Sequence, residues 1–235
     1  MAQHYTARVA AKNQLTEKVY LVDFQIVNPP TLDFKAGQNI MLLISEGVNR
    51  TMSIASPPQG DGHILMVQDV APMGPGSLWT LGLKIGDEVR FVAPTGGALS
   101  MIDSSRQKVL AATGTGIAPF RAMILDFLHK QTDVPNSLLL LYWGLRYETD
   151  VYWADEFGDL EKKYPNFKFN LILSKPADIW TGKRGHVTEH IMRDVKDLPD
   201  SDFYLCGNKE MIKDVKAQLL VNNVPEAQIK TELFY

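Results

Sequence analysis

The sequence contains very little cysteine: Cys206 is the only one in 235 residues. A single cysteine excludes an intrachain disulfide and an iron–sulfur cluster held by four cysteines of this chain, and it fits a reducing cytoplasm. No apolar run approaches the roughly 20 residues that a membrane-spanning helix needs. The amino-terminal residues also lack the basic-then-apolar pattern of a signal peptide. We therefore expect a cytoplasmic protein without a transmembrane segment.

An excess of charge of one sign is also missing. The 24 Lys and Arg residues nearly balance the 27 Asp and Glu residues, for a net charge of −3. Nucleic-acid binding needs clustered basic residues, so we expect no nucleic-acid partner. Internal repeats and low-complexity tracts are absent as well. The chain instead has 45% hydrophobic and 22% charged residues, which is typical of a globular protein with a sizeable core.

The first part of the chain, residues 1–103, reads as short strands separated by turns. Runs with β-branched and aromatic residues alternate with segments rich in proline and glycine, and one helix is expected at about 76–82. This rhythm predicts a small antiparallel barrel. The predicted strands are YTARVAA, KVYLVDFQI, NIMLLIS, RTMSIAS, HILMVQDV and DEVRFVA.

The second part, residues 104–235, has a different rhythm. Compact apolar runs such as KVLAAT, SLLLLYW, FKFNLILS and DFYLC are typical of strands that are covered on both faces. Strands that alternate with helices predict a parallel, Rossmann-like sheet. The expected joint between the two domains is residues 102–107. The helices are expected at 117–130, 151–163, 185–195 and 208–221.

A glycine turn connects the first strand of this second part, 108–112, to a helix that opens near Ile117. Glycine lets the backbone at 114–116 turn tightly and approach a ligand closely, and free N–H groups at a helix start favour a phosphate. Pro119 suits a first helical turn. The pattern is G-x-G-x-x-P, not the common G-x-G-x-x-G. By itself it is also compatible with a plain strand-to-helix turn.

Four other short motifs accompany this turn, in a fixed order along the chain. They are RTMS at 50–53, GPGS at 74–77, CG at 206–207 and TELFY at 231–235. The set resembles the ferredoxin–NADP reductase superfamily, which includes NAD(P)H:flavin reductases and the reductase modules of oxygenases. The resemblance implies an FAD-binding Greek-key β-barrel at 1–103 followed by an NAD(P)-binding α/β domain at 104–235. It also implies an electron-transfer enzyme with FAD and NAD(P)H as cofactors.

The RTMS motif falls where the family binds flavin. By resemblance, Arg50 would pair with the flavin phosphate, a task suited to a fixed fork of donors. Ser53 is a catalytic candidate that would hydrogen-bond the isoalloxazine edge near N5, together with the neighbouring Thr51 and Met52. Met52 replaces the family's aromatic residue, which implies an unusual flavin affinity or potential; the alternative is an ordinary core methionine. The alternative for Arg50 is an ordinary barrel-surface arginine.

The GPGS motif would bind flavin phosphate at the start of the barrel's helix, through Gly74, Gly76 and Ser77. The alternative is simple helix capping by Ser77. A pyrophosphate bound here favours FAD over FMN. The resemblance adds a strand whose backbone lines the flavin, at Val67, Gln68 and Asp69.

The resemblance assigns the glycine turn to the nicotinamide nucleotide. Arg146 could meet a 2′-phosphate, whereas Glu148 or Asp150 could accept from a 2′-hydroxyl. Ser174 and Lys175 fall where NADP-preferring relatives place a Ser-Arg pair. The choice between NADH and NADPH therefore stays open. The nucleotide-binding residues expected at the turn are Thr113, Gly114, Thr115, Gly116 and Pro119.

Two further catalytic candidates lie near the end of the chain. Cys206-Gly207 match the family's C-G turn, which brings a sulfur near the reacting nicotinamide carbon; the alternative is a buried structural cysteine. Glu232 would influence the proton supply near N5, and the alternative is an exposed terminal acid. Phe234 aligns with the family's terminal aromatic residue, which stacks on the flavin and must swing away. Tyr235 is an additional residue that is expected to take part.

A different short motif, HVTEH at 186–190, matches the H-x-x-E-H pattern of some zinc peptidases. Zinc would need a third protein ligand and an open coordination position. The preceding TGKRG resembles the family's loop into a surface helix. We therefore expect no metal site.

The predicted function is that of an FAD-dependent NAD(P)H oxidoreductase that passes electrons to a separate ferredoxin- or flavodoxin-like acceptor. One alternative is an NAD(P)H:flavin reductase that releases reduced free flavin. Another alternative is a non-catalytic electron-transfer or regulatory subunit, because fold alone does not establish activity.

Overall fold

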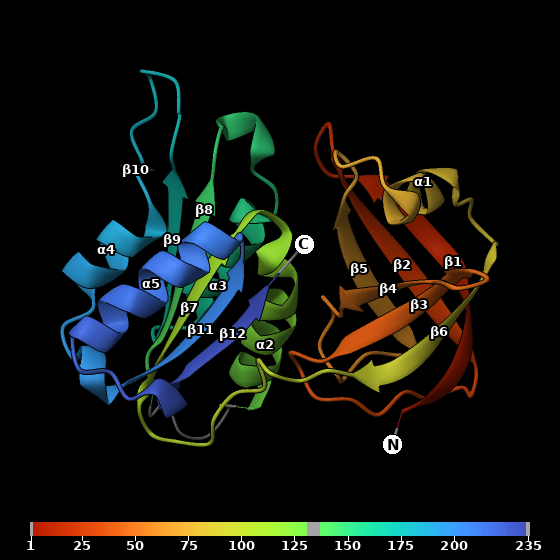
Figure 1. Ribbon diagram of the computed structural model, residues 1–235, viewed down its shortest axis with the longest axis horizontal. Helices are drawn as coiled ribbons and strands as arrows, with labels where there is room; N and C mark the ends of the chain where they lie inside the picture. Colours follow the sequence, from red (N-terminus) through yellow and green to blue (C-terminus); the bar gives the residue numbers. More distant parts are fainter. Residues whose placement is uncertain (1, 131–136, 234–235) are drawn as a thin grey trace. The chain divides into compact units, whose positions relative to one another are not determined.

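The computed structural model describes residues 2–130 and 137–233 (Figure 1). It divides into two compact units: Met1–Met101 with Ala118–Phe127, and Ile102–Ile117 with Leu128–Tyr235. Ile102, the first residue of the predicted joint, is also the first residue of the second unit. None of the helices in the described segments is long and apolar enough to cross a membrane.

In the described part of the first unit, an antiparallel six-stranded sheet has the order β4-β3-β6-β1-β2-β5. Helix α1, Pro75–Gly82, lies between β5 and β6 in the chain. The predicted antiparallel barrel fold is confirmed, and α1 lies where a helix was expected within residues 1–103. The strands are β1 Gln3–Gln14, β2 Val19–Asn28, β3 Asn39–Ser45, β4 Val48–Ser53, β5 His63–Asp69 and β6 Glu88–Thr95.

The core of this unit follows from side chains that alternate between the two faces of each strand. On β1, Tyr5, Ala7 and Val9 are buried, with more accessible residues between them. The Tyr5 ring stacks on Phe91 of β6 with 5.4 Å between centroids. The same alternation on β2, β3, β5 and β6 supplies most of the remaining core. On β4, by contrast, the consecutive residues Asn49, Arg50 and Thr51 are all exposed.

In the described part of the second unit, a parallel six-stranded sheet has the order β10-β9-β8-β7-β11-β12. The chain builds outward from β7 through β8 to β9, then returns to the other side of β7 for β11 and β12. The predicted parallel sheet is confirmed, and β10 and β12 add to it. The strands are β7 Gln107–Thr113, β8 Leu139–Leu145, β9 Phe167–Leu173, β10 Lys183–Arg184, β11 Ser201–Gly207 and β12 Ile229–Leu233.

Helices cover both faces of this parallel sheet. Helices α4 (Val187–Asp194) and α5 (Lys209–Val221) pack together on one face, where Tyr142 of β8 joins their buried apolar residues. The next residue, Trp143, points to the opposite face and lies 6.2 Å, centroid to centroid, from Phe157 of α3 (Ala154–Lys163). Figure 1 shows α4 and α5 in front of the sheet. The remaining helix, α2, is Ile117–Lys130 and follows the glycine turn.

A buried ion pair lies at the amino ends of β7 and β11. The Lys108 ammonium group is 2.8 Å from the Asp202 carboxylate, and their side chains are 2% and 0% exposed. Ser104 and Arg106 also donate hydrogen bonds to Asp202. Burial alone would raise the pKa of Asp202, but the hydrogen bonds from Lys108, Ser104 and Arg106 lower it. Through Ser104 and Arg106, these hydrogen bonds attach the segment before β7 to the sheet.

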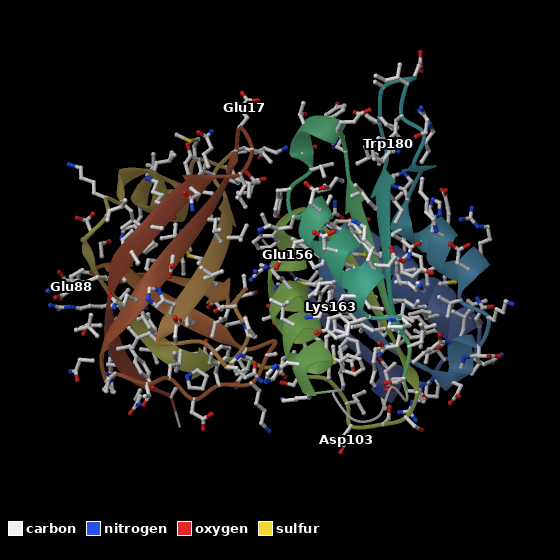
Figure 2. All side chains as sticks on the ribbon, turned by 180° about the vertical axis from the view of Figure 1, so that it is seen from behind. Glu17, Glu88, Asp103, Glu156, Lys163 and Trp180 are labelled. Atoms are coloured by element: carbon white, nitrogen blue, oxygen red, sulfur yellow. The ribbon has the colours of Figure 1, made fainter. Side chains whose placement is uncertain are left out.

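This anchored segment and the loop between β9 and β10 lie at opposite ends of the sheet. Figure 2 shows Asp103 at one end and Trp180, in the loop between β9 and β10, at the other. The carboxyl ends of the parallel strands are at the Trp180 end, because β9 leads into that loop. Ligands of open parallel sheets bind at this kind of edge.

Candidate functional site

The structure brings the RTMS and GPGS motifs together on the first unit. Arg50 lies on β4, Gln68 on β5 and Gly76 in the first turn of α1. A Cβ built on Gly76 would lie 3.1 Å from Gln68 Nε2 and 3.3 Å from Arg50 Cγ. The absence of a side chain at Gly76 therefore lets Gln68 and Arg50 lie close to the first turn of α1. The surface around Arg50, Gln68 and Gly76 is called the barrel site below.

Thr80 orients one member of the barrel site and was missed by the sequence analysis. Its hydroxyl donates a 2.5 Å hydrogen bond to Gln68 Oε1, and the Thr80 side chain is buried. With that oxygen engaged, the Nε2 donor of Gln68 faces Gly76. Helical spacing could have identified Thr80, because it follows Gly76 by one turn of α1 and lies on the same side of the helix.

The start of α1 suits an anion. Gly74 is the N-cap residue and no side chain caps this end, Pro75 occupies the first helical turn, and no acidic residue is present there. Unpaired N–H groups and the positive end of the helix dipole favour a phosphate at such a position. Ser77 is buried and lies inside the helix, so it is not the N-cap residue. With the exposed Arg50 side chain nearby, these residues fit the phosphates of FAD.

The other predicted flavin residues lie on β4 and β5 around the barrel site. Thr51 is exposed, Met52 is half-buried against the barrel core, and Ser53 is buried. On β5, Val67 is buried, whereas Asp69 is half-buried and accepts a 2.8 Å hydrogen bond from the Ala71 amide. Arg50 itself donates a 2.7 Å hydrogen bond to the Asn49 carbonyl. All of these roles stay predictions.

The second candidate site lies at the carboxyl ends of β7 and β11, which are neighbours in the sheet. Ala112 pairs with Cys206, so the turn after β7 meets the turn after β11. The Asn208 amide donates a 2.9 Å hydrogen bond to Thr113 Oγ1. A Cβ on Gly116 would overlap with the Cys206 carbonyl. The sheet order reverses between these strands, and open parallel sheets bind their ligands at such a switch point.

The glycine turn itself has a defined conformation. Residues Gly114–Gly116 form a short 3-10 turn that runs into α2, and Gly114 has a φ of 54°, in the left-handed region that favours glycine. Thr115 is half-buried, and Pro119 is buried in the first turn of α2. Trp143 Nε1 donates a 2.9 Å hydrogen bond to the Gly114 carbonyl. Trp143 was not among the predicted site residues.

The ends of β8 and β9 form the adjoining edge of this site. The Lys175 amide donates a 2.9 Å hydrogen bond to the Arg146 carbonyl, and both side chains are exposed. The Ser174 amide and hydroxyl both donate to the Leu145 carbonyl. The structure thus brings the predicted cations Arg146 and Lys175 to neighbouring backbone positions.

Both acidic candidates at this edge accept hydrogen bonds from the protein's own backbone. Glu148 Oε1 accepts a 2.8 Å hydrogen bond from the Ala177 amide. Asp150 Oδ2 accepts a 3.1 Å hydrogen bond from the Tyr147 amide. These carboxylates therefore brace the loops after β8 and β9.

Cys206 and Glu232 occupy paired positions on β11 and β12. The Cys206 side chain is completely buried, and burial, together with the charge of Glu232, raises the pKa of its thiol well above the usual value. Cys206 is therefore a neutral thiol at physiological pH. Glu232 is half-buried. The catalytic roles of both residues stay predictions, and Phe234 and Tyr235 lie outside the described residues.

The HVTEH segment forms the start of α4, and its second histidine is fully engaged. His190 Nε2 lies 2.8 Å from the Arg184 carbonyl, to which it must donate, and Nδ1 lies 2.7 Å from Arg193 Nη2, from which it accepts. His186 is exposed at the helix N-cap. Within residues 2–130 and 137–233, no group of three or more His, Cys, Asp or Glu side chains could hold a metal ion.

Comparison with known proteins gives matches along the whole chain. The family model for the oxidoreductase NAD-binding domain matches residues 110–217. "Ferredoxin--NADP reductase B" of Sorangium cellulosum (strain So ce56) is 28% identical over 224 residues, 92% of this chain and 91% of that protein. The NAD(P)H-flavin reductase of Aliivibrio fischeri is 31% identical over 208 residues, 86% of this chain and 85% of that protein.

Solved structures match over a similar extent. An Amycolatopsis cytochrome P450 reductase superimposes with a TM-score of 0.90 at 24% identity, covering 99% of this chain and 70% of that one. The chain thus has the fold of this two-domain reductase.

Proposed function

Because the chain belongs to the ferredoxin–NADP reductase superfamily and is an oxidoreductase with FAD and NAD(P)H as cofactors, we propose that it takes electrons from NAD(P)H and passes them to a separate acceptor. The observation that carries this proposal is the meeting of Gly116 with Cys206 and Gly207 at the switch point of the parallel sheet. A side chain at Gly116 would overlap with the Cys206 carbonyl, and a side chain at Gly207 would overlap with Thr113.

The barrel site would hold FAD. Bound FAD supplies a hydride-accepting ring and the capacity to release electrons singly. The protein contributes the Arg50 guanidinium and the first-turn N–H groups of α1 for the phosphates. Gln68, oriented by Thr80, contributes a fixed amide donor beside Gly76. Ser53 would position the reacting edge of the ring.

The Arg50 assignment is tested by comparison with another barrel arginine. Arg50→Ala should lose FAD on desalting, because it removes a charge-assisted contact worth roughly 1.5–3 kcal/mol, or about 10- to 150-fold in affinity. Arg90→Ala is the matched control, since Arg90 is an exposed arginine of β6 in the same sheet. Equal retention of FAD by the two variants would identify Arg50 as an ordinary surface arginine.

Ser53→Ala should act differently from Arg50→Ala. We expect it to retain FAD and to slow reduction of the flavin by NAD(P)H in anaerobic stopped-flow measurements. A wild-type rate of reduction would remove Ser53 from the site.

The geometry of the β8–β9 edge favours NADPH over NADH. Arg146 and Lys175 present exposed cations at adjacent positions, whereas Glu148 and Asp150 are engaged by backbone amides. Arg146→Ala should therefore lower kcat/KM for NADPH about tenfold or more, in line with a lost hydrogen bond to a charged group, and leave kcat/KM for NADH unchanged. An equal loss with both nucleotides would contradict a 2′-phosphate contact.

The acceptor is proposed to be a ferredoxin- or flavodoxin-like protein, with released free flavin as the second candidate. Two matched relatives illustrate the two possibilities, a ferredoxin–NADP reductase and an NAD(P)H-flavin reductase. Flavin that stays bound through gel filtration and is bleached by NADPH supports the first candidate. Loss of flavin on desalting, with turnover that follows added riboflavin or FMN, would replace it with the second. A colourless protein that takes up no flavin would refute both.

A further inference from the structure

An aromatic cluster lies behind the glycine turn. Trp143 packs edge-on against Tyr152, with 4.9 Å between centroids and 78° between planes, and against Phe157 at 6.2 Å. Tyr152 contacts Trp153 at 5.2 Å, and Phe157 contacts Phe169 at 5.3 Å. These five residues are called the aromatic cluster below. Its central member, Trp143, is completely buried.

The cluster is firmly held together. Trp153 has a φ of 55°, a left-handed conformation that is uncommon for a bulky residue and persists where the surrounding packing requires it. Gly144, next to Trp143, leaves no room for a side chain, because a Cβ there would lie 2.9 Å from Val187 Cγ1. The Trp143 ring itself is completely buried and packs against Tyr152 and Phe157, so it has little freedom to rotate.

The only polar atom of the Trp143 side chain is directed at the glycine turn. A buried indole N–H requires an acceptor, and Trp143 Nε1 donates to the carbonyl of Gly114 at 2.9 Å. Gly114 is the first residue of the turn and has a φ of 54°. Glycine backbone in a turn can change orientation at low cost, so this hydrogen bond restricts a peptide that could otherwise turn over.

The orientation of the Gly114 carbonyl determines that of the next amide. A trans peptide is planar, and its C=O and N–H groups point in opposite directions. Because the Gly114 carbonyl points to Trp143, the N–H of Thr115 must point away from the aromatic cluster. If the peptide turned over, a carbonyl oxygen would replace that N–H on the outer side of the turn. A phosphate would then meet a repelling oxygen instead of a donor.

We propose that Trp143 is a positioning residue for the pyrophosphate of the pyridine nucleotide: its indole N–H holds the Gly114–Thr115 peptide so that the Thr115 N–H faces the ligand. The inference rests on the proposed function, since it requires that the glycine turn binds NAD(P)H. A purely structural role is the alternative, in which the hydrogen bond only satisfies a buried donor. If Trp143 is a positioning residue, loss of its N–H weakens nucleotide binding beyond what the loss of stability explains. If its role is only structural, loss of the N–H lowers stability and leaves nucleotide binding unchanged.

The experiment removes the indole N–H donor and keeps an aromatic side chain at position 143. Trp143→Phe in the flavin-loaded protein is titrated with NADP⁺ and with NAD⁺ by calorimetry, and its kinetics with NADPH are measured. We expect Kd and KM to rise together by about 3- to 10-fold, the effect of one hydrogen bond, with kcat within twofold of wild type. If this variant does not fold, benzothienylalanine at position 143 serves instead, because it has the shape of tryptophan without the N–H.

Phe157→Leu is the matched control. Phe157 is a completely buried member of the same cluster and packs on Trp143, but the variant keeps the indole donor. It should lower the melting temperature at least as much as Trp143→Phe and leave the nucleotide Kd unchanged.

Two results would overturn the inference alone: a Trp143→Phe Kd equal to that of wild type, or an equal loss of affinity in Phe157→Leu, which would indicate a structural role. Failure of the wild-type protein to bind either nucleotide would overturn the proposed function and the inference with it.

Discussion

Replacing Asp202 by Asn should destabilise the second unit far more than any change at an exposed ion pair. Asp202 is 0% exposed and receives hydrogen bonds from Lys108 at 2.8 Å, from Arg106 at 2.9 Å and from Ser104. Lys108 is 2% exposed, so Asn at position 202 leaves its ammonium group buried without a counter-ion. Breaking such a pair costs about 3–5 kcal/mol. For a chain of this size the melting temperature should fall by roughly 6–20 °C.

The matched control is Asp159→Asn. The Lys162–Asp159 pair has the same 2.8 Å separation, but its side chains are 80% and 74% exposed. Solvent and salt screen such a pair. This variant should therefore have the melting temperature of the wild type. Thermal and urea unfolding, followed by tryptophan fluorescence and near-ultraviolet circular dichroism, measure both variants. Comparable losses in the two variants, or a loss below about 1 kcal/mol in Asp202→Asn, would refute the argument from burial.

A double variant separates the cost of an unpaired charge from the worth of the pair. In Lys108→Met with Asp202→Leu no uncompensated charge remains, because Arg106 is 31% exposed and can be hydrated. Apolar replacement of a whole buried pair is often neutral or stabilising. The double variant should therefore be more stable than Asp202→Asn. A double variant as unstable as the single one would show that the hydrogen bonds to Ser104 and Arg106 dominate.

Three further outcomes are expected. Because hydrogen bonds lower the pKa of Asp202, its contribution to the free energy of unfolding should be complete above the unfolded-state pKa of about 4 and be lost as the pH falls below it. Urea titrations from pH 7 to pH 2 should show this loss in wild type and its reduction in Asp202→Asn. Gly116→Ala should weaken NADP⁺ binding by about tenfold or more, since its Cβ would overlap with the Cys206 carbonyl. Gly158→Ala, in an open part of α3, should bind NADP⁺ normally and gain up to about 1 kcal/mol of stability. Unaltered calorimetric affinity in Gly116→Ala would contradict the close approach of the two turns. Because burial raises the pKa of the Cys206 thiol, a thiol reagent at pH 8 should label the folded protein far more slowly than the urea-unfolded chain. Fast labelling of the folded chain would show that the thiol is accessible.

The strands missed by the sequence analysis show what local patterns leave out. β10 has only two residues, Lys183 and Arg184, so it has no period to detect. β12, Ile229–Leu233, joins as an edge strand through parallel pairing with β11. Its partner is distant in the sequence, and only one of its residues is fully buried. Both strands form because a neighbouring strand, β9 or β11, provides hydrogen bonds. A short stretch of sequence does not show which strand will be its neighbour.

The sequence by itself determined the two fold classes and the position of the glycine turn. Alternating burial on β1 and β2 and continuous burial on β7 and β11 are properties of local residue order, since side chains in a strand have a period of two. The resemblance also assigned Arg50, Gly76 and Gly116 to predicted binding sites, because each lies within a short motif.

The tertiary structure alone decided how these residues act together. Thr80 orients Gln68, Trp143 holds the Gly114 carbonyl, and Glu148 braces a loop. Each interaction joins elements separated along the chain, and its formation depends on how strands and helices pack. A hydrogen bond requires its two atoms to meet within about 3 Å, and only the packed fold determines which atoms meet.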